Sequence, residues 1–159
     1  MNYMKNIIFF CVGVLVAASA SAGENLPAKE TNAEAADAKA MQGVWRPLEA
    51  ALAGVPFPPP VVKGITLKIT GDKYDVTVEG APQPDKGTVR LDATTTPKRL
   101  ICAGVEGPNQ GKTLLAIYEF KDADTLRICY DLAGAKHPAE FSSTEGTRLF
   151  LVTYKRQKE

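Results

Sequence analysis

The sequence predicts an all-β protein: an eight-stranded β-barrel or sandwich preceded by a short N-terminal helix. Short segments with alternating apolar and polar residues recur at regular spacing, with turn residues between them, which is typical of barrels and sandwiches. Two of these segments, residues 115–120 and 125–131, flank a tight acidic turn and have the composition of a hairpin. Closing the strands into a barrel would leave no exposed sheet edge.

The first 22 residues have the composition of a secretory signal peptide. Lys5 precedes an apolar run at residues 7–18, and Ala-Ser-Ala at residues 20–22 forms a cleavage site. We therefore expect an exported protein, periplasmic, cell-surface or secreted, with no stable membrane span after cleavage. Cys11 raises the alternative of a lipoprotein. Phe10 occupies the position where a lipoprotein signal requires a small residue, so we interpret Cys11 as part of the cleaved segment.

The rest of the chain is predicted to form one domain with balanced charge. Signal cleavage removes one of the 19 basic residues and none of the 18 acidic ones, so the formal net charge becomes zero. The basic residues are scattered, apart from Lys155, Arg156 and Lys158 near the end of the chain. This pattern gives no indication of a nucleic-acid or membrane-surface partner. We expect the barrel domain to occupy residues 41–159.

Residues 23–40 are polar and begin as a flexible tether. The second half of this segment has signals for a helix. Thr31 or Asn32 can cap its start, Glu34 falls in its first turn, and Gly43 lies where a glycine commonly ends a helix. We expect a short helix that leads directly into the first strand.

After Gly43 the apolar residues recur with a period of two. The expected strands are residues 44–52, 65–70, 74–79, 88–92, 98–103, 115–120, 125–131 and 148–155. Pro47 lacks a backbone donor, which predicts an edge or a bulge in the first strand. The prolines at residues 58–60 predict a stiff extended connection, and residues 80–87 a loop.

The hairpin pattern also predicts a register. If residues 122–124 form the turn, Phe120 faces Leu126, Tyr118 faces Ile128, and Ala116 faces Tyr130. The opposite face then pairs Glu119 with Arg127, an ion pair that contributes about 0.2–1 kcal/mol. A slip of one residue would turn the whole apolar set to the wrong face.

The remaining polar and reactive residues give no catalytic or metal site, and we expect neither an enzyme nor a cofactor. Asp122 and Asp124 fit turn chemistry better than calcium binding or acid–base catalysis. His137 is the only histidine, which excludes a multi-histidine zinc site, and it lies in a loop. Residues 107–113 have three residues between their glycines where a phosphate-binding loop has four, and they lead into a strand.

Two cysteines, Cys102 and Cys129, remain in a compartment that permits disulfides. In a simple meander they lie two strands apart, about 9–10 Å at ordinary strand spacing. This separation is beyond the reach of a disulfide bond. Two buried free thiols are therefore favoured, and a disulfide is the alternative.

Five residues on apolar strand faces are candidates to line the barrel interior: Tyr74, Val76, Tyr118, Ile128 and Tyr130. Tyrosine combines a hydrophobic ring with a hydrogen-bonding hydroxyl. An eight-stranded barrel is either filled by its own side chains or holds one small ligand. Inward tyrosines fit both a filled core and a cavity with a few polar groups.

Four stretches resemble a known family. They read MQGVW at residues 41–45, GVEGPNQGKT at 104–113, the segment from AIYEF to EFSS at 116–143, and VTYKR at 152–156. Together they are similar to an uncharacterised lipocalin-like (calycin-type) domain family abundant in planctomycete bacteria. The likeness extends over residues 41–156 and departs at Pro47.

The resemblance implies an eight-stranded up-and-down antiparallel β-barrel of the lipocalin type and a structural signature formed by Gly43, Trp45 and Arg156. In lipocalin relatives the tryptophan packs across the closed barrel end beneath a basic residue of the last strand, here Arg156 or Lys155. The implied function is an extracytoplasmic protein that binds a small apolar or amphipathic ligand in the barrel. The alternative is a solid-core protein-interaction or inhibitor module acting through the loops at residues 55–64, 103–112 and 132–147.

Overall fold

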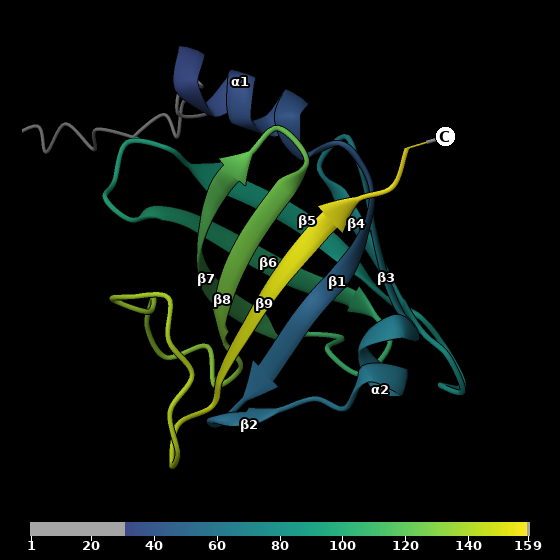
Figure 1. Cartoon of the computed structure of the whole chain (residues 1–159). Helices are drawn as coiled ribbons and strands as arrows, with labels where there is room; N and C mark the ends of the chain where they lie inside the picture. The colour runs from purple at the N-terminus through teal and green to yellow at the C-terminus, as the bar shows by residue number, and fades with distance from the viewer. Residues whose placement is uncertain (1–30, 159) are drawn as a thin grey trace, which may run out of the picture.

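The computed structural model describes residues 31–158, which form a closed antiparallel β-barrel with one helix packed at its end (Figure 1). The helices are α1 (Asn32–Met41) and α2 (Pro59–Lys63). The strands are β1 (Gly43–Leu52), β2 (Val55–Pro56), β3 (Ile65–Thr70), β4 (Lys73–Val78), β5 (Asp85–Asp92), β6 (Lys98–Glu106), β7 (Thr113–Asp122), β8 (Thr125–Asp131) and β9 (Leu149–Arg156). The predicted signal peptide lies outside the described residues.

The barrel consists of eight strands, because β2 is a two-residue extension that pairs only with the end of β1. From β3 to β9 each strand pairs with the next one in the sequence. β9 then pairs with β1, from Trp45 opposite Arg156 to Leu52 opposite Phe150, and this pairing closes the barrel. The predicted fold class, an eight-stranded up-and-down lipocalin-like barrel with a short N-terminal helix, is confirmed.

α1 begins at a capping box. The Thr31 hydroxyl accepts from the backbone N–H of Glu34 at 3.1 Å, and the Glu34 carboxylate accepts from the backbone N–H of Thr31 at 2.8 Å. The helix ends at Met41, and Gly43 adopts a φ of +117°, which favours glycine. These two termini place α1 across the barrel end at which β1 starts and β9 ends (Figure 1).

Trp45 fills the barrel end beneath α1. Its side chain is fully buried, and its indole Nε1 donates to the carbonyl of Met41 at 2.9 Å. The guanidinium of Arg156 lies 4.1 Å from the centroid of the indole ring. The tryptophan therefore packs between the helix and a basic residue of the last strand, the arrangement that the resemblance implies.

The structure differs from a regular meander at β1, at the connection before β3 and at the start of β5. The register of β1 against β9 shifts between Pro47 and Glu49, and Leu48 turns outward with 61% of its surface exposed. This irregularity fits the missing backbone donor of Pro47. The extended connection predicted at residues 58–60 is wrong, because α2 starts at Pro59. Proline fits the first turn of a helix, where the backbone N–H has no partner within the helix.

β5 begins at Asp85, three residues before the predicted strand, and so shortens the loop predicted at residues 80–87. A register shift between Lys86 and Gly87 hides the alternation that would have revealed this start. The predicted hairpin pairs are present, including Tyr118 opposite Ile128, but a register shift between Phe120 and Asp122 pairs Asp122 with Thr125, so β7 extends into the predicted turn. Arg127 Nη2 lies 2.6 Å from Glu119 Oε1 on the outer face, as predicted.

Residues 137–142 of the loop after β8 pack against the outside of the barrel. The carbonyl of Ser142 lies 3.3 Å from the Cys129 thiol, and the guanidinium of Arg127 lies 4.6 Å from the centroid of the Phe141 ring. His137 is half-buried, and its Nδ1 donates to the carbonyl of Ala116 at 2.9 Å. His137 lies in a loop, as predicted, and this loop is folded down onto the strands.

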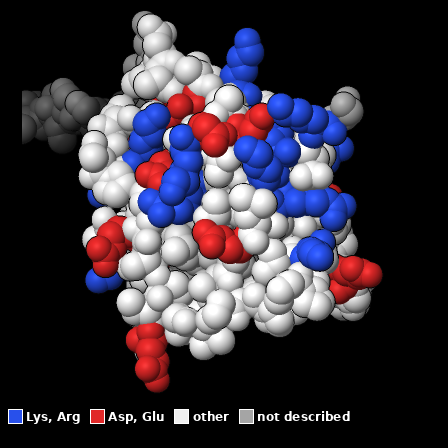
Figure 2. All heavy atoms as spheres, viewed as in Figure 1, with Lys and Arg blue, Asp and Glu red and all other residues white. Residues whose placement is uncertain are grey.

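Lysine and arginine side chains gather on the upper part of the face formed by β1, β8 and β9, with acidic side chains among them (Figure 2). Ion pairs explain this mixing: Lys158 and Arg156 both pair with Asp124, at 3.0 and 3.3 Å. The lower part of the same face, at the barrel end opposite α1, is mostly uncharged (Figure 2). In residues 31–158 no helix has the length and apolar character needed to cross a membrane.

Candidate ligand cavity

The two ends of the barrel interior differ. Beneath α1 the interior is filled by large side chains with less than 2% of their surface exposed, among them Met41, Trp45, Tyr118 and Leu126. Toward the opposite end the interior contains a cavity of about 280 Å³. An engineered apolar cavity of about 150 Å³ is known to bind benzene, so this volume is large enough for a small organic molecule.

Most of the cavity wall is apolar and comes from the inward faces of the strands. The apolar residues that line it are Leu52, Phe57, Ile65, Leu67, Ile69, Val76, Val78, Val89, Leu100, Leu114, Ile128, Leu132 and Phe150. Polar groups come from Tyr74, Asp85, Cys102, Asn109, Tyr130 and Tyr154. An apolar cavity with a small number of placed polar groups is the usual composition of a small-molecule site.

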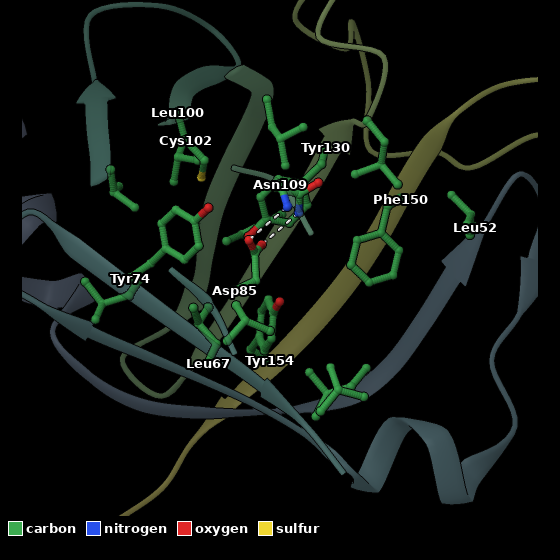
Figure 3. Close-up of a pocket in the computed structure, with 18 of the residues that line it drawn as sticks. Leu52, Leu67, Tyr74, Asp85, Leu100, Cys102, Asn109, Tyr130, Phe150 and Tyr154 are labelled. Atoms are coloured by element: carbon green, nitrogen blue, oxygen red, sulfur yellow. Dashed lines mark hydrogen bonds between the residues drawn. The ribbon is translucent and has the colours of Figure 1, made fainter. Parts of the chain in front are cut away.

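Three tyrosine hydroxyls face the interior from β4, β8 and β9. Burial raises the pKa of Tyr74, Tyr130 and Tyr154, so these phenols remain neutral hydrogen-bonding groups. The Tyr74 hydroxyl is buried and has no hydrogen-bond partner among the described residues. Figure 3 shows the hydroxyls of Tyr74 and Tyr130 directed into the cavity. An unpaired buried hydroxyl costs about 1–3 kcal/mol, and a ligand that pairs with it would recover part of this cost.

Gly87 allows the Tyr74 ring to lie against β5. The two residues are paired across β4 and β5. A Cβ atom at Gly87 would come within 2.6 Å of Tyr74 Cε1 and 2.1 Å of the Ala103 carbonyl oxygen. Because neither contact is sterically allowed, the position of the Tyr74 ring depends on a residue without a side chain.

Asp85 and Asn109 form a polar group on the cavity wall. Asn109 Nδ2 donates to Asp85 Oδ2 at 2.7 Å, and the Asn109 backbone N–H donates to Asp85 Oδ1 at 3.3 Å (Figure 3). Gly107 makes this contact possible, because a Cβ atom there would lie 2.3 Å from the carbonyl oxygen of Pro84. The loop between β6 and β7 is thus held against the start of β5.

The two described cysteines are free thiols, one on the inner face of the barrel and one on the outer face. Cys102 lines the cavity, and burial, with a smaller contribution from the charge of Asp85, raises its pKa from 9.0 to about 12. Cys129 lies next to the inward-facing residues Ile128 and Tyr130 in β8 and therefore points outward. At neutral pH Cys102 is a small, uncharged and nearly apolar part of the lining.

Four of the five predicted lining residues lie together in the cavity: Tyr74, Val76, Ile128 and Tyr130. Tyr118 does not line it. Its ring points inward but lies at the filled end, and its hydroxyl donates to Asp37 Oδ2 of α1 at 2.7 Å. Lys98 Nζ lies 2.6 Å from the same oxygen. The inward face of a strand passes through both halves of the barrel, so alternation alone does not distinguish Tyr118 from Tyr130.

Sequence reasoning missed several cavity residues. Tyr154 and Phe150 follow the alternation of the last strand, so this pattern could have identified them. Asp85 and Asn109 had no such signal, since Asp85 begins a strand just before a bulge and Asn109 lies in a loop. Their contact depends on tertiary structure.

Neither a model of a known protein family nor a protein of curated function matches this sequence. The structure alone therefore limits what the site can do. The described residues contain no group of three or more His, Cys, Asp or Glu side chains placed to hold a metal ion. The arrangement fits noncovalent binding of a small, mainly apolar molecule.

Proposed function

We propose that this protein is an extracytoplasmic lipocalin-like binding protein that holds a small apolar or amphipathic molecule in its barrel. The main support is the cavity of about 280 Å³, enclosed by strands at the end of the barrel opposite Trp45. Its wall is mostly aliphatic and aromatic, with three tyrosines. Burying apolar ligand surface in such a site is favourable by about 25 cal/mol per Å².

The architecture supports a preformed site. Hydrogen-bonded strands fix the side chains of the wall, and α1 with Trp45 and Arg156 closes the other end. A rigid cavity loses little conformational entropy when it binds, which favours affinity for a small ligand. The proposal includes export, on the basis of the signal-peptide composition of residues 1–22, and membership of the lipocalin-like family that the sequence resembles.

The alternative is a protein-interaction or inhibitor module that acts through its loops. One observation favours it: Val55, Val61 and Val105 are exposed, at 65%, 43% and 56%, in or beside the predicted contact loops. A solid core is part of that alternative, and the cavity is evidence against it. Small-molecule binding is therefore the preferred function.

Native mass spectrometry of the mature protein, purified from its own host, tests the proposal. We expect a reproducible mass excess that organic extraction removes, together with a released compound. Val76→Phe, which fills the cavity, should lose the excess, whereas Thr77→Phe on the exposed outer face of the same strand should retain it. If none of the three proteins shows a mass above that of its own polypeptide, the proposal is contradicted.

A further inference from the structure

We propose that the cavity selects an amphipathic molecule with an amine head group, and that Asp85 is the counter-charge for the protonated amine. This inference rests on the proposed binding function and adds the chemical class of the ligand. It follows from three properties of the cavity: the charge of its wall, the set of hydrogen-bond acceptors near Asp85, and the aromatic rings.

The charge of the lining is one-sided. Among the described residues that form the wall, Asp85 has the one charged side chain, and none is lysine, arginine or histidine. No ion pair links Asp85 to a basic residue of the described chain, whereas its neighbour Lys86 pairs with Glu106 at 3.3 Å. Opposite charge in a partly buried site favours a cationic ligand, and like charge disfavours an anionic one such as a fatty acid.

The polar groups near Asp85 can accept hydrogen bonds. A carboxylate has about four acceptor positions, and Asn109 uses two of them, through its backbone N–H and its Nδ2. The side-chain oxygen of Asn109 is then left as an acceptor, because its nitrogen is turned toward Asp85. The Tyr74 hydroxyl has no partner among residues 31–158. A protonated primary amine has three donors and no acceptor, so it can pair with any of these oxygen atoms.

The field of Asp85 extends into the cavity. Its charge contributes to the raised pKa values of both Tyr74 and Cys102, which line the same space. The rings of Tyr74, Tyr130 and Tyr154 supply aromatic faces, which attract cations. Leu67, Leu100 and Ile128 offer an apolar wall for the body of the ligand. A cationic head at Asp85 with an apolar body against this wall uses both parts of the site.

Asp85 lies at the start of β5, and the Asp85–Asn109 contact joins that strand to the loop between β6 and β7. This is the barrel end opposite α1, where a ligand can keep its polar head near solvent while its apolar body enters the interior. The placement fits an amphipathic ligand better than a fully apolar one.

Matched probes with one chain and different head groups test the inference. Octylamine, octan-1-ol and octanoate are titrated, below their aggregation concentrations, against the mature protein loaded with the fluorescent apolar dye N-phenyl-1-naphthylamine. We expect octylamine to displace the dye with at least tenfold higher affinity than octanoate, and octan-1-ol to lie between them.

Asp85→Asn removes the charge and keeps the size of the side chain. In this variant we expect the affinities for octylamine and octan-1-ol to converge within threefold, and that for octanoate to increase. Glu106→Gln is the matched control, because Glu106 is an exposed acid of the neighbouring strand that does not line the cavity. It should retain the wild-type order of affinities.

The outcomes separate the two proposals. If octan-1-ol displaces the dye but octylamine has no advantage over octanoate in the wild-type protein, the amine inference is overturned and the binding function stands. Retention of the amine preference in folded Asp85→Asn would also overturn the role of Asp85. If neither the dye nor any probe binds, the binding function fails. The wild-type series is decisive even if the variant does not fold.

Discussion

The guanidinium of Arg156 lies 4.1 Å from the centroid of the Trp45 ring, and this contact fastens the closed end of the barrel. The same side chain donates to backbone carbonyls at the C-terminal end of α1 and in the turn between β7 and β8, and it pairs with an acid of that turn. These partners are Ala40, Gln42, Ala123 and Asp124. One residue of the last strand therefore joins the helix, the first strand and the central hairpin.

Arg156→Ala should lower the free energy of unfolding by about 2–4 kcal/mol, because it removes the cation–π contact and leaves several carbonyls without their donor. Arg156→Lys should lower the free energy of unfolding by about half as much, since an ammonium group lacks the planar fork of the guanidinium. Urea unfolding measures both. Lys158→Ala, which removes an exposed partner of Asp124, is the control and should change stability by less than about 0.5 kcal/mol.

Tyr118→Phe should loosen α1 without affecting the cavity. The variant loses the hydrogen bond from the hydroxyl to Asp37, at a cost of about 1–2 kcal/mol. Hydrogen exchange should therefore accelerate at the amides of α1, while the affinity for N-phenyl-1-naphthylamine changes by less than twofold. Tyr130→Ala changes a residue inside the cavity, serves as the comparison, and should lower the affinity for the dye. A large loss of dye affinity in Tyr118→Phe would place that residue in the binding site after all.

Gly87→Ala should disturb both stability and binding. Its Cβ atom would overlap the carbonyl oxygen of Ala103 and the ring of Tyr74, and overpacking of this kind costs about 1–3 kcal/mol. Displacement of the Tyr74 ring should also lower the affinity for the dye. Thr88→Ala, one residue further along β5, is the control. Wild-type urea midpoint and dye affinity in Gly87→Ala would refute the packing described for Tyr74.

The protein should lose stability in alkali. Burial raises the pKa of Cys102 from 9.0 to about 12, and it raises the pKa values of Tyr74, Tyr130 and Tyr154 above 10.0. Below pH 9 these groups are protonated in both states and stability is unaffected. Above it the unfolded chain loses protons that the folded chain retains. Each group then lowers the free energy of unfolding by up to about 1.4 kcal/mol per pH unit, until the pH reaches the pKa of that group in the folded state.

Urea midpoints from pH 7 to 11 measure this effect. They should be constant to about pH 9 and then decrease. Burial also raises the pKa of Cys129. In the double variant Cys102→Ala/Cys129→Ala the decrease should therefore begin near pH 10, where the tyrosines of the unfolded chain start to ionise. A midpoint that stays constant up to pH 11 would contradict the burial of these groups.

The central hairpin could be predicted in detail because all of its information is local. The acidic turn fixes the loop, and the alternation of apolar residues then leaves one register in which Tyr118 faces Ile128 and Glu119 faces Arg127. The capped helix at Thr31 is equally local. Barrel closure required only one further step, the pairing of the last strand with the first.

The remaining features depend on tertiary contacts. Whether an inward residue lies in the filled half or in the cavity is decided by α1, whose Asp37 takes Tyr118 as a partner. Asp85 meets Asn109 only because the loop between β6 and β7 folds back onto β5. The alternation of residues along single strands has no information about either contact.

Binding of N-phenyl-1-naphthylamine by the wild-type protein, Val76→Phe and Thr77→Phe tests the central claim most directly. Both variants introduce the same side chain at neighbouring positions of β4, one inside the cavity and one on the exposed outer face. If the cavity is the binding site, the wild type and Thr77→Phe should bind one dye with similar affinity, and folded Val76→Phe should bind at least tenfold more weakly. Equal binding by all three proteins, or binding by none, would contradict the account.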